Sequence, residues 1–243
     1  MSGHSKWSTI KRKKGANDAQ RAKIFTKIAR EIIVAVKAGG PDPDNNSSLK
    51  DAIAKARSNN MPNDNINRTI KKAAGDTDGD NYESITYEGY GPAGVAVIVN
   101  ALTDNRNRTA ADVRHAFDKN GGNMGQTGCV SFMFDQKGII IIENEDMDED
   151  EITMDALEAG ADDIEVEDGV AEIVTAPSDM GVVRDALAEK YTISSAEVSM
   201  VPQTMTELTE EGQINAMTKL LDMLEDNDDV QDVYHNWDMP SED

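Results

Sequence analysis

The first 75 residues contain three stretches in which apolar side chains recur every three or four positions, the period of an amphipathic helix. The longest places Phe25, Ile28, Ile32 and Val36 on one stripe, and Gly39-Gly40-Pro41 ends it. Three such stretches with short joints predict a small helical bundle. The expected helices are 17–38 with an Asn17 cap, 48–61 with a capping box at Ser48–Asp51, and 63–75 with a cap at Asn63 or Asp64.

After a polar linker, the pattern changes to the short apolar runs that are typical of strands. From residue 138 the predicted order is βαββαβ, which is the ferredoxin-like pattern. A helix and a strand near the carboxyl end would complete the preceding ββαβ segment, so the ferredoxin-like unit would be an insertion. The predicted strands are 85–88, 95–102, 129–134, 139–142, 164–166, 171–175, 196–201 and 230–237, and the predicted helices are 109–119, 149–159, 178–190 and 210–224.

The sequence therefore predicts an α+β protein: an N-terminal helical bundle plus two α/β domains, one ferredoxin-like and inserted in the other. We expect a basic helical domain with an N-terminal arm over residues 1–75. A discontinuous α/β middle domain would consist of residues 80–135 and 205–240. An acidic ferredoxin-like domain would be inserted in it over residues 136–204.

No stretch approaches the ~18 apolar residues that a membrane-spanning helix needs. Residues 1–15 lack the apolar core of a secretory signal. A single cysteine, Cys129, excludes an internal disulfide and fits a reducing compartment. We therefore expect a cytoplasmic protein without membrane contact.

Charge is divided unevenly along the chain. Residues 1–75 hold 16 Lys and Arg against 6 Asp and Glu, a net +10, whereas the remainder holds 8 against 40, a net −32. A basic end of this kind is typical of polyanion binding, because side chains that neutralise phosphates release condensed counterions. Solubility is the simpler explanation of the acidic remainder.

The basic side chains of the arm and the first helix form the main candidate site. On the helix, Lys23, Lys27 and Arg30 fall opposite the apolar stripe. Trp7 lies among the basic residues of the arm, where an indole can stack on an unpaired base. The alternative is an ordinary solvated helix face, with Trp7 packed on the bundle. The candidate contacts to nucleic acid are Lys6, Trp7, Lys11, Arg12, Lys13, Lys14, Lys23, Lys27 and Arg30.

A second cationic candidate is the stretch Thr103–Thr109, between a predicted strand and a predicted helix. Arg106 and Arg108 stand out there in an acidic region, and Asn107 is the expected helix cap. Guanidinium groups at a strand end can hold phosphate. The alternative is that these arginines pair with nearby carboxylates, and the sequence leaves both interpretations open.

The remaining motifs do not match the dinucleotide, calcium, metal or catalytic sites that their residue types could suggest. Gly89–Gly94 matches G-x-G-x-x-G, but a strand is predicted after it where a dinucleotide site needs a helix. Two acidic runs, beginning at Asp76 and Asp146, lack the glycine and the final glutamate of a calcium loop. No histidine is spaced for a metal site, and Cys129 lies in an apolar run. We expect no metal, no cofactor and no enzyme; an active site built from distant carboxylates is the remaining alternative.

Five short stretches resemble the YebC family: Gly3–Trp7, Asn60–Pro62, Tyr87–Pro92, Thr103–Thr109 and Val130–Asp135. They follow the order of the family along nearly the whole chain. The resemblance implies a helical domain followed by two α/β domains around a cleft, without enzymatic activity or cofactor. It also implies a DNA-binding transcriptional regulator, or a ribosome-associated translational role like that of the mitochondrial activators of cytochrome c oxidase.

Together these observations predict a non-enzymatic regulator of gene expression that grips nucleic acid, DNA or ribosomal RNA, through its basic amino end. The alternative is a protein-interaction module whose acidic domains dock on basic ribosomal or polymerase proteins. The lack of a helix-turn-helix or zinc-finger signature favours RNA, whereas the resemblance favours DNA.

Overall fold

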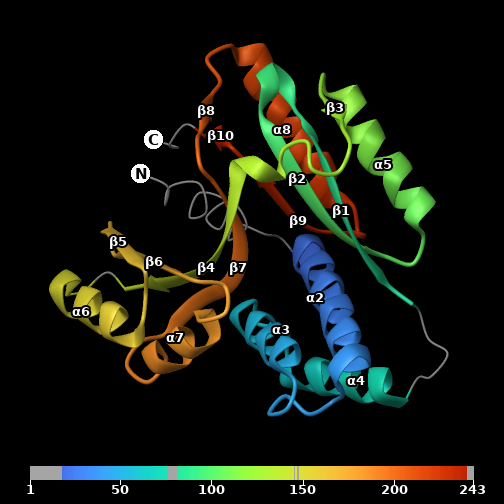
Figure 1. The fold of residues 1–243 in the computed structure, drawn as a ribbon. Coiled ribbons are helices and arrows are strands. Elements are labelled where there is room, and N and C mark those ends of the chain that lie inside the picture. The colour runs from blue at the N-terminus through green and yellow to red at the C-terminus, as the bar shows by residue number, and fades with distance from the viewer. Residues whose placement is uncertain (1–17, 76–80, 145, 147, 240–243) are drawn as a thin grey trace. The chain divides into compact units, whose positions relative to one another are not determined.

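The computed structural model describes residues 18–75, 81–144, 146 and 148–239 (Figure 1). The chain folds into two compact units. Unit I contains residues 35–74 and 136–201, and unit II contains the described parts of residues 2–34, 75–135 and 202–243. The predicted arm and the predicted Asn17 cap lie outside the described residues.

Three helices open the described chain, as predicted: α2 (Asp18–Gly39), α3 (Ser47–Ser58) and α4 (Asn63–Gly75). The start of α3 differs from the prediction. Its cap is Asn46 in place of a capping box at Ser48, and the Asn46 side chain accepts from the Leu49 N–H at 3.1 Å. Asn46 Nδ2 also donates to the carbonyls of Ala35 and Gly40, at 2.8 Å each. The same amide therefore starts α3 and satisfies carbonyls at the end of α2.

Helix α3 ends at Ser58, before the predicted stop at Pro62. Asn60 adopts a left-handed conformation with φ of 58°, and the Met61 N–H bonds back to the Ala56 carbonyl at 2.9 Å. This pair of features is a Schellman ending, in which asparagine takes the position that glycine usually occupies.

Unit II is built on a four-stranded antiparallel sheet of order β3-β1-β2-β9. Two helices pack on one face of it, where Val97 and Val99 meet Val113 and Phe117 of the first helix and Leu220 of the second. A short parallel pair, β8 with β10, completes the unit. The elements are β1 (Glu83–Tyr90), β2 (Ala96–Thr103), α5 (Arg106–Lys119), β3 (Asn123–Met124), β8 (Thr206–Glu207), α8 (Glu211–Asp226), β9 (Val230–His235) and β10 (Trp237–Asp238).

The glycine-rich motif is the turn between β1 and β2, as predicted. A short 3-10 turn, η1 (Pro92–Gly94), lies within it, and the Gly91 N–H closes the turn on the Val95 carbonyl at 2.7 Å. Gly94 has φ of +82°, a conformation that disfavours a side chain. A strand follows directly, so the motif has no helix to meet a pyrophosphate.

Unit I contains a second four-stranded sheet, of order β5-β6-β4-β7. The elements follow one another along the chain as βαββαβ. This succession and the strand order together make the ferredoxin-like arrangement that the sequence predicted. Ile140 and Ile173 of the sheet pack against Ile152 and Ala156 of one helix and Val183 of the other. The elements are β4 (Phe134–Glu143), α6 (Glu149–Ala159), β5 (Asp163–Glu167), β6 (Val170–Thr175), α7 (Met180–Leu187) and β7 (Ile193–Pro202).

The predicted strand 129–134 is wrong. Those residues form a loop and a 3-10 turn, η2 (Ser131–Met133), and β4 begins only at Phe134. The backbone N–H groups of Val130 and Ser131 bond to the Glu88 carboxylate, each at 2.8 Å, so they are not available for strand pairing. Within the described part of the chain, no helix is long and apolar enough to span a membrane.

Candidate nucleic-acid interface

The predicted basic stripe of α2 begins the described part of the candidate site. Lys23, Lys27 and Arg30 occupy positions i, i+4 and i+7, so they share one helix face. Lys23 Nζ lies 2.9 Å from Asp226 Oδ1, and Lys27 Nζ donates to the Glu225 carbonyl at 2.7 Å. All three residues are partly covered, because α8 ends beside them and presents carbonyl and carboxylate acceptors, so the stripe is not the ordinary solvated face of the alternative interpretation.

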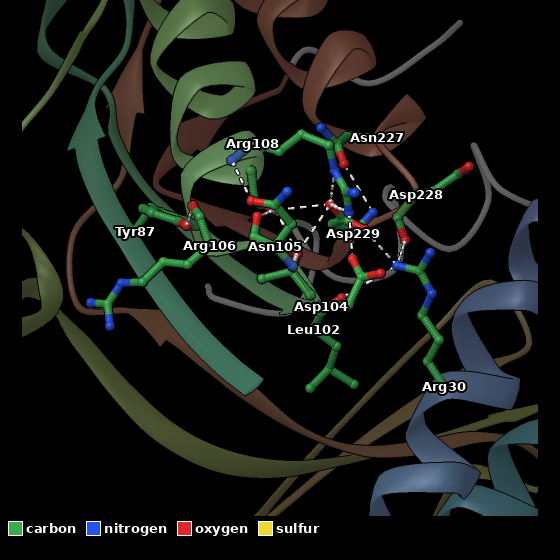
Figure 2. A network of polar contacts seen from close by, with 12 residues as sticks. Arg30, Tyr87, Leu102, Asp104, Asn105, Arg106, Arg108, Asn227, Asp228 and Asp229 are labelled. Carbon is green, nitrogen blue, oxygen red and sulfur yellow. Dashed lines mark hydrogen bonds and ion pairs between the residues drawn. The ribbon is translucent and has the colours of Figure 1, made fainter. Parts of the chain in front are cut away.

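Arg30 inserts furthest into this region (Figure 2). Its Nη1 donates to the Asp228 carbonyl at 2.7 Å, to Asp229 Oδ1 at 2.8 Å and to the Leu102 carbonyl at 3.3 Å. The guanidinium carbon also lies 5.2 Å from the centre of the Tyr82 ring. Arg30 therefore joins three segments of unit II, and its side chain has a structural role there.

Asp229 is the centre of the polar network in Figure 2, and its side chain is only 5% exposed. One carboxylate oxygen accepts from Arg30. The other accepts from Arg108 Nη2 at 2.7 Å and Thr109 Oγ1 at 2.8 Å, and Thr103 Oγ1 lies 3.3 Å away. Burial tends to raise the pKa of Asp229, but the hydrogen bonds from Arg108, Thr109 and Arg30 outweigh it and hold the pKa below its ordinary value.

Arg106 and Arg108 differ in their surroundings although they share the first turn of α5. The cap of this helix is Asn105, two residues before the predicted cap Asn107, and its side chain accepts from the Arg108 N–H at 3.1 Å. Arg108 is held by Asp229 and, at 2.8 Å, by Asp104, and both hydrogen bonds raise the pKa of its guanidinium. Arg106 points away from this cluster, is 68% exposed and lies 3.9 Å from Glu83 Oε2.

The pairing interpretation thus describes Arg108 well, whereas Arg106 is mostly exposed and has only a long ion pair with Glu83. An open hollow of about 440 Å³ lies beside this network. Five carboxylates and only two guanidinium groups line it, which makes it unfavourable for phosphate. Binding of nucleic acid by Arg106 and Arg108 stays a prediction.

Helix α4 presents three exposed cations, Arg68, Lys71 and Lys72. Their i, i+3, i+4 spacing places them on one helix face, while Ile66 and Ala73 are buried on the other side. The sequence shows this spacing, but they were not among the candidates, which concentrated on the arm and α2. They are the clearest exposed basic group on the described helices.

Six candidates, all in the arm, lie outside the described residues: Lys6, Trp7, Lys11, Arg12, Lys13 and Lys14.

The cysteine and a histidine of the described chain have surroundings that bear on possible chemistry. Burial first, and the nearby Glu88 second, raise the pKa of the Cys129 thiol, which disfavours the thiolate of a nucleophile. The ring of His235 is buried and accepts from the Trp237 N–H at 3.3 Å. Among the described residues, no group of three or more His, Cys, Asp or Glu is arranged for a metal ion.

Comparisons with known proteins identify one family along nearly the whole chain. Residues 5–76 match the TACO1/YebC protein N-terminal domain, and residues 82–237 match the TACO1/YebC second and third domain. A probable transcriptional regulatory protein of Acetivibrio thermocellus is 62% identical over 239 residues, which cover 98% of this chain and 99% of the relative. One from Clostridium tetani is 60% identical over 244 residues, covering 100% and 99%.

A solved structure agrees with the sequence comparisons. The crystal structure of a conserved hypothetical protein from Aquifex aeolicus matches with a TM-score of 0.84 at 44% identity, over 93% of each chain. The resemblance first drawn from five short stretches is thereby confirmed. Since the two family matches together reach from residue 5 to residue 237, the chain belongs to the TACO1/YebC family.

Proposed function

We propose that this protein is a non-enzymatic, cytoplasmic regulator of gene expression that binds the phosphate backbone of nucleic acid through its basic amino-terminal part. The observation that carries the proposal is the charge division, +10 over residues 1–75 against −32 over the remainder. The names of the relatives as probable transcriptional regulatory proteins support a regulatory role. Contacts of this electrostatic kind give affinity that depends on salt and little on base sequence.

The contacts that these cations already make favour some of them over others for this purpose. Lys23, Lys27 and Arg30 already bond to acceptors between residues 225 and 229, so using them for phosphate would break those contacts. Arg68, Lys71 and Lys72 on α4 are exposed, and the contact given for them is a local one, from Arg68 to the Asn65 side chain on the same helix. The phosphate contacts are therefore expected from the arm and α4 more than from α2.

The salt dependence of binding tests this proposal. Fluorescence anisotropy with a 20-bp DNA duplex and a 20-bp RNA duplex, from 50 to 300 mM salt, gives the slope of log K against log salt. Deleting residues 1–15 removes five cations, and should make the DNA slope shallower by up to about 4.5. Replacing the α4 cations together, Arg68→Gln, Lys71→Gln and Lys72→Gln, should remove up to about 2.7 more.

The matched control is Lys219→Gln, an exposed lysine of α8 in the acidic part of the chain, which should leave the slope unchanged. Full binding by the deletion variant would refute the proposal. The choice between DNA and RNA is made by crosslinking in cells and sequencing the bound fragments. Genomic DNA indicates transcriptional regulation, ribosomal RNA indicates a translational role, and recovery of neither refutes both.

A second candidate function has its own observation, the surface of α6. Met154 is 63% exposed and Leu157 is 51% exposed, and helical geometry places the exposed acids Asp150, Glu151 and Glu158 around them. Residues 138–183 contain 16 Asp and Glu and no Lys or Arg. An apolar pair within an acidic ring suits a basic protein surface that also offers apolar side chains.

The α6 surface is tested by binding of a synthetic amphipathic Leu/Lys helical peptide, measured by calorimetry. If α6 is a docking surface, the double variant Met154→Ser and Leu157→Ser weakens binding at least tenfold with all acids still present. Val182→Ser, at an exposed apolar site of α7, is the control. Equal binding by the α6 and α7 variants would show only general attraction to the acidic chain.

A further inference from the structure

A buried carboxylate fixes the loop that connects β3 to β4. Glu88 is 3% exposed, and its two oxygens accept from the backbone N–H groups of Gly128, Val130 and Ser131, each at 2.8 Å. Burial tends to raise the pKa of Glu88, but these hydrogen bonds outweigh it and hold the pKa below its ordinary value. The carboxylate is therefore charged at neutral pH, and three charge-assisted hydrogen bonds hold the loop backbone.

Further contacts fix both ends of the same loop. Val130 and Phe134 are buried, and the Tyr90 hydroxyl donates to the Cys129 carbonyl at 3.1 Å. The Met133 carbonyl accepts from the Gln203 N–H at 2.9 Å. The turn η2 lies between these anchors, so the position of every residue in it is determined by its neighbours.

This fixed turn presents Phe132 to solvent, with 68% of the residue exposed. Burying a phenylalanine side chain stabilises a protein by about 1.5–3 kcal/mol, and here that stabilisation is not obtained. The anchors hold the backbone that carries the ring in place without covering the ring. A binding side chain on a rigid backbone loses little conformational freedom when a ligand arrives.

The charges around Phe132 are unusual for this chain. Residues 119–134 contain no Asp or Glu and one lysine, although the whole chain has 46 acidic residues among 243. The nearby Glu88 is charged but buried, and its three N–H donors partly offset its charge. A polyanion therefore meets less repulsion at this loop, whose nearest exposed acid in the sequence is Asp135, than across residues 138–183.

We propose that Phe132 is a stacking platform for an unpaired base of single-stranded nucleic acid. This rests on the proposed function, and adds a contact to bases that the electrostatic contacts lack. An exposed aromatic ring on a fixed, acid-free loop provides a flat apolar surface that every base can contact. Paired bases in a duplex keep their faces covered, so the contact selects single strands, loops or splayed ends.

The test uses the full chain and a 12-nucleotide oligouridine RNA, with a 12-bp RNA duplex as the comparison ligand. Phe132→Ala should weaken oligouridine binding about 5- to 150-fold, the range for one lost stacking contact. Duplex binding should change less than about twofold. The salt slope should stay the same, because the ring carries no charge.

Three further variants separate stacking from other effects. Phe132→Trp should restore oligouridine binding, whereas Phe132→Leu should not, because leucine is apolar but has no flat π-face. Val182→Ala is the control at another exposed apolar site. Melting temperatures of all variants should match that of the parent, because the Phe132 ring is exposed.

The outcomes distinguish this proposal from the proposed function. If the parent binds oligouridine with a steep salt slope and Phe132→Ala binds equally well, the stacking proposal is wrong and the proposed function stands. If Phe132→Leu restores binding, the contact is apolar docking, and stacking is again refuted. If the parent binds neither oligouridine nor duplex at low salt, the proposed function fails, and the stacking proposal fails with it.

Discussion

The polar network of unit II joins side chains from three distant parts of the sequence, namely Arg30, Arg108 and Asp229. The Asp229 carboxylate accepts hydrogen bonds from both guanidinium groups. Such a network contributes little net stability compared with an apolar core, because the charges lose water when they are buried. Its members nevertheless depend strongly on one another. Removing one partner leaves the others desolvated and unpaired, which costs more than the intact network contributes.

Asp229→Asn tests this dependence. The amide keeps the size of the side chain but removes the charge and turns one acceptor into a donor that faces Arg108 or Arg30. We expect the free energy of unfolding at pH 7 to fall by about 2–4 kcal/mol, measured by urea titration with circular dichroism. Asp228→Asn is the control, because that residue is exposed and offers Arg30 only its backbone carbonyl. Equal losses for the two variants would contradict a special role for Asp229.

The pH dependence of stability gives a second test of the same carboxylate. Because the pKa of Asp229 is lower in the folded protein, its charged form stabilises the fold. That contribution is complete above the unfolded pKa, about 4, and is lost as the pH falls through the folded pKa. The difference between parent and Asp229→Asn in unfolding free energy should therefore be constant from pH 7 to about 5 and shrink below about 4. A difference that stays constant down to pH 3 would refute this assignment.

At the scale of elements, the sequence predicted which segments form helices and strands better than it predicted where they begin. The apolar period identified α2, α3 and α4 directly, because each buries one face. It missed the Asn46 cap, since several capping residues stand together before α3 and only tertiary contacts select one. It also misassigned residues 129–134, where the Glu88 carboxylate, 42 and 43 residues away from Val130 and Ser131, takes the N–H groups that a strand would use.

Asn46 should therefore matter more than an ordinary cap. Asn46→Ala removes the acceptor for Leu49 and the donors to Ala35 and Gly40, and should lower the unfolding free energy by about 1–3 kcal/mol. Asn46→Ser keeps the cap alone and should recover about half of that loss in urea titrations. Asn45→Ala, at the exposed neighbour, should change stability by less than about 0.5 kcal/mol. If the serine variant is no better than alanine, the cap contributes nothing.

Strand β4 contains a glycine that the packing of unit I requires. A Cβ on Gly138 would lie 2.6 Å from the Cβ of Met180 and would also collide with Thr175 Oγ1. Gly138→Ala should therefore cost about 1–3 kcal/mol by overpacking. Gly212→Ala provides the control, because Gly212 lies in the first turn of α8 with open space around it, so an added Cβ meets nothing there. Thermal unfolding of both variants checks the prediction, and equal melting temperatures would refute it.

At the scale of the whole molecule, the charge division was visible in the sequence because it extends over 75 residues. The Asp229 network was not, since nothing in the sequence distinguishes this residue among 46 acidic ones. The same difficulty applies to the cations. The pattern placed Lys23, Lys27 and Arg30 on one face of α2, but it could not show that acceptors from residues 225–229 lie against that face.

The whole-molecule consequence is that local charge, and not the net charge of −22, decides binding to polyanions. At 0.15 M salt, charges separated by more than about 8 Å are largely screened from one another. We therefore expect the protein to be retained on a heparin column despite its negative net charge. Two quadruple variants shift the net charge equally, one to −26 and the other to −18. The first neutralises the arm by Lys11→Gln, Arg12→Gln, Lys13→Gln and Lys14→Gln, and the second neutralises exposed acids by Glu158→Gln, Asp162→Asn, Glu165→Gln and Glu189→Gln.

The arm variant should elute at much lower salt than the parent, while the acid variant should elute within about 30 mM of it. The reason is that heparin binds where cations are concentrated, and at 0.15 M salt an exposed acidic side chain repels a bound sulfate only within about 8 Å. Equal and opposite shifts in elution salt would instead show that net charge governs the interaction. In that case the +10 block would have no separate role, and binding would depend on the acidic part of the chain as much as on the basic part.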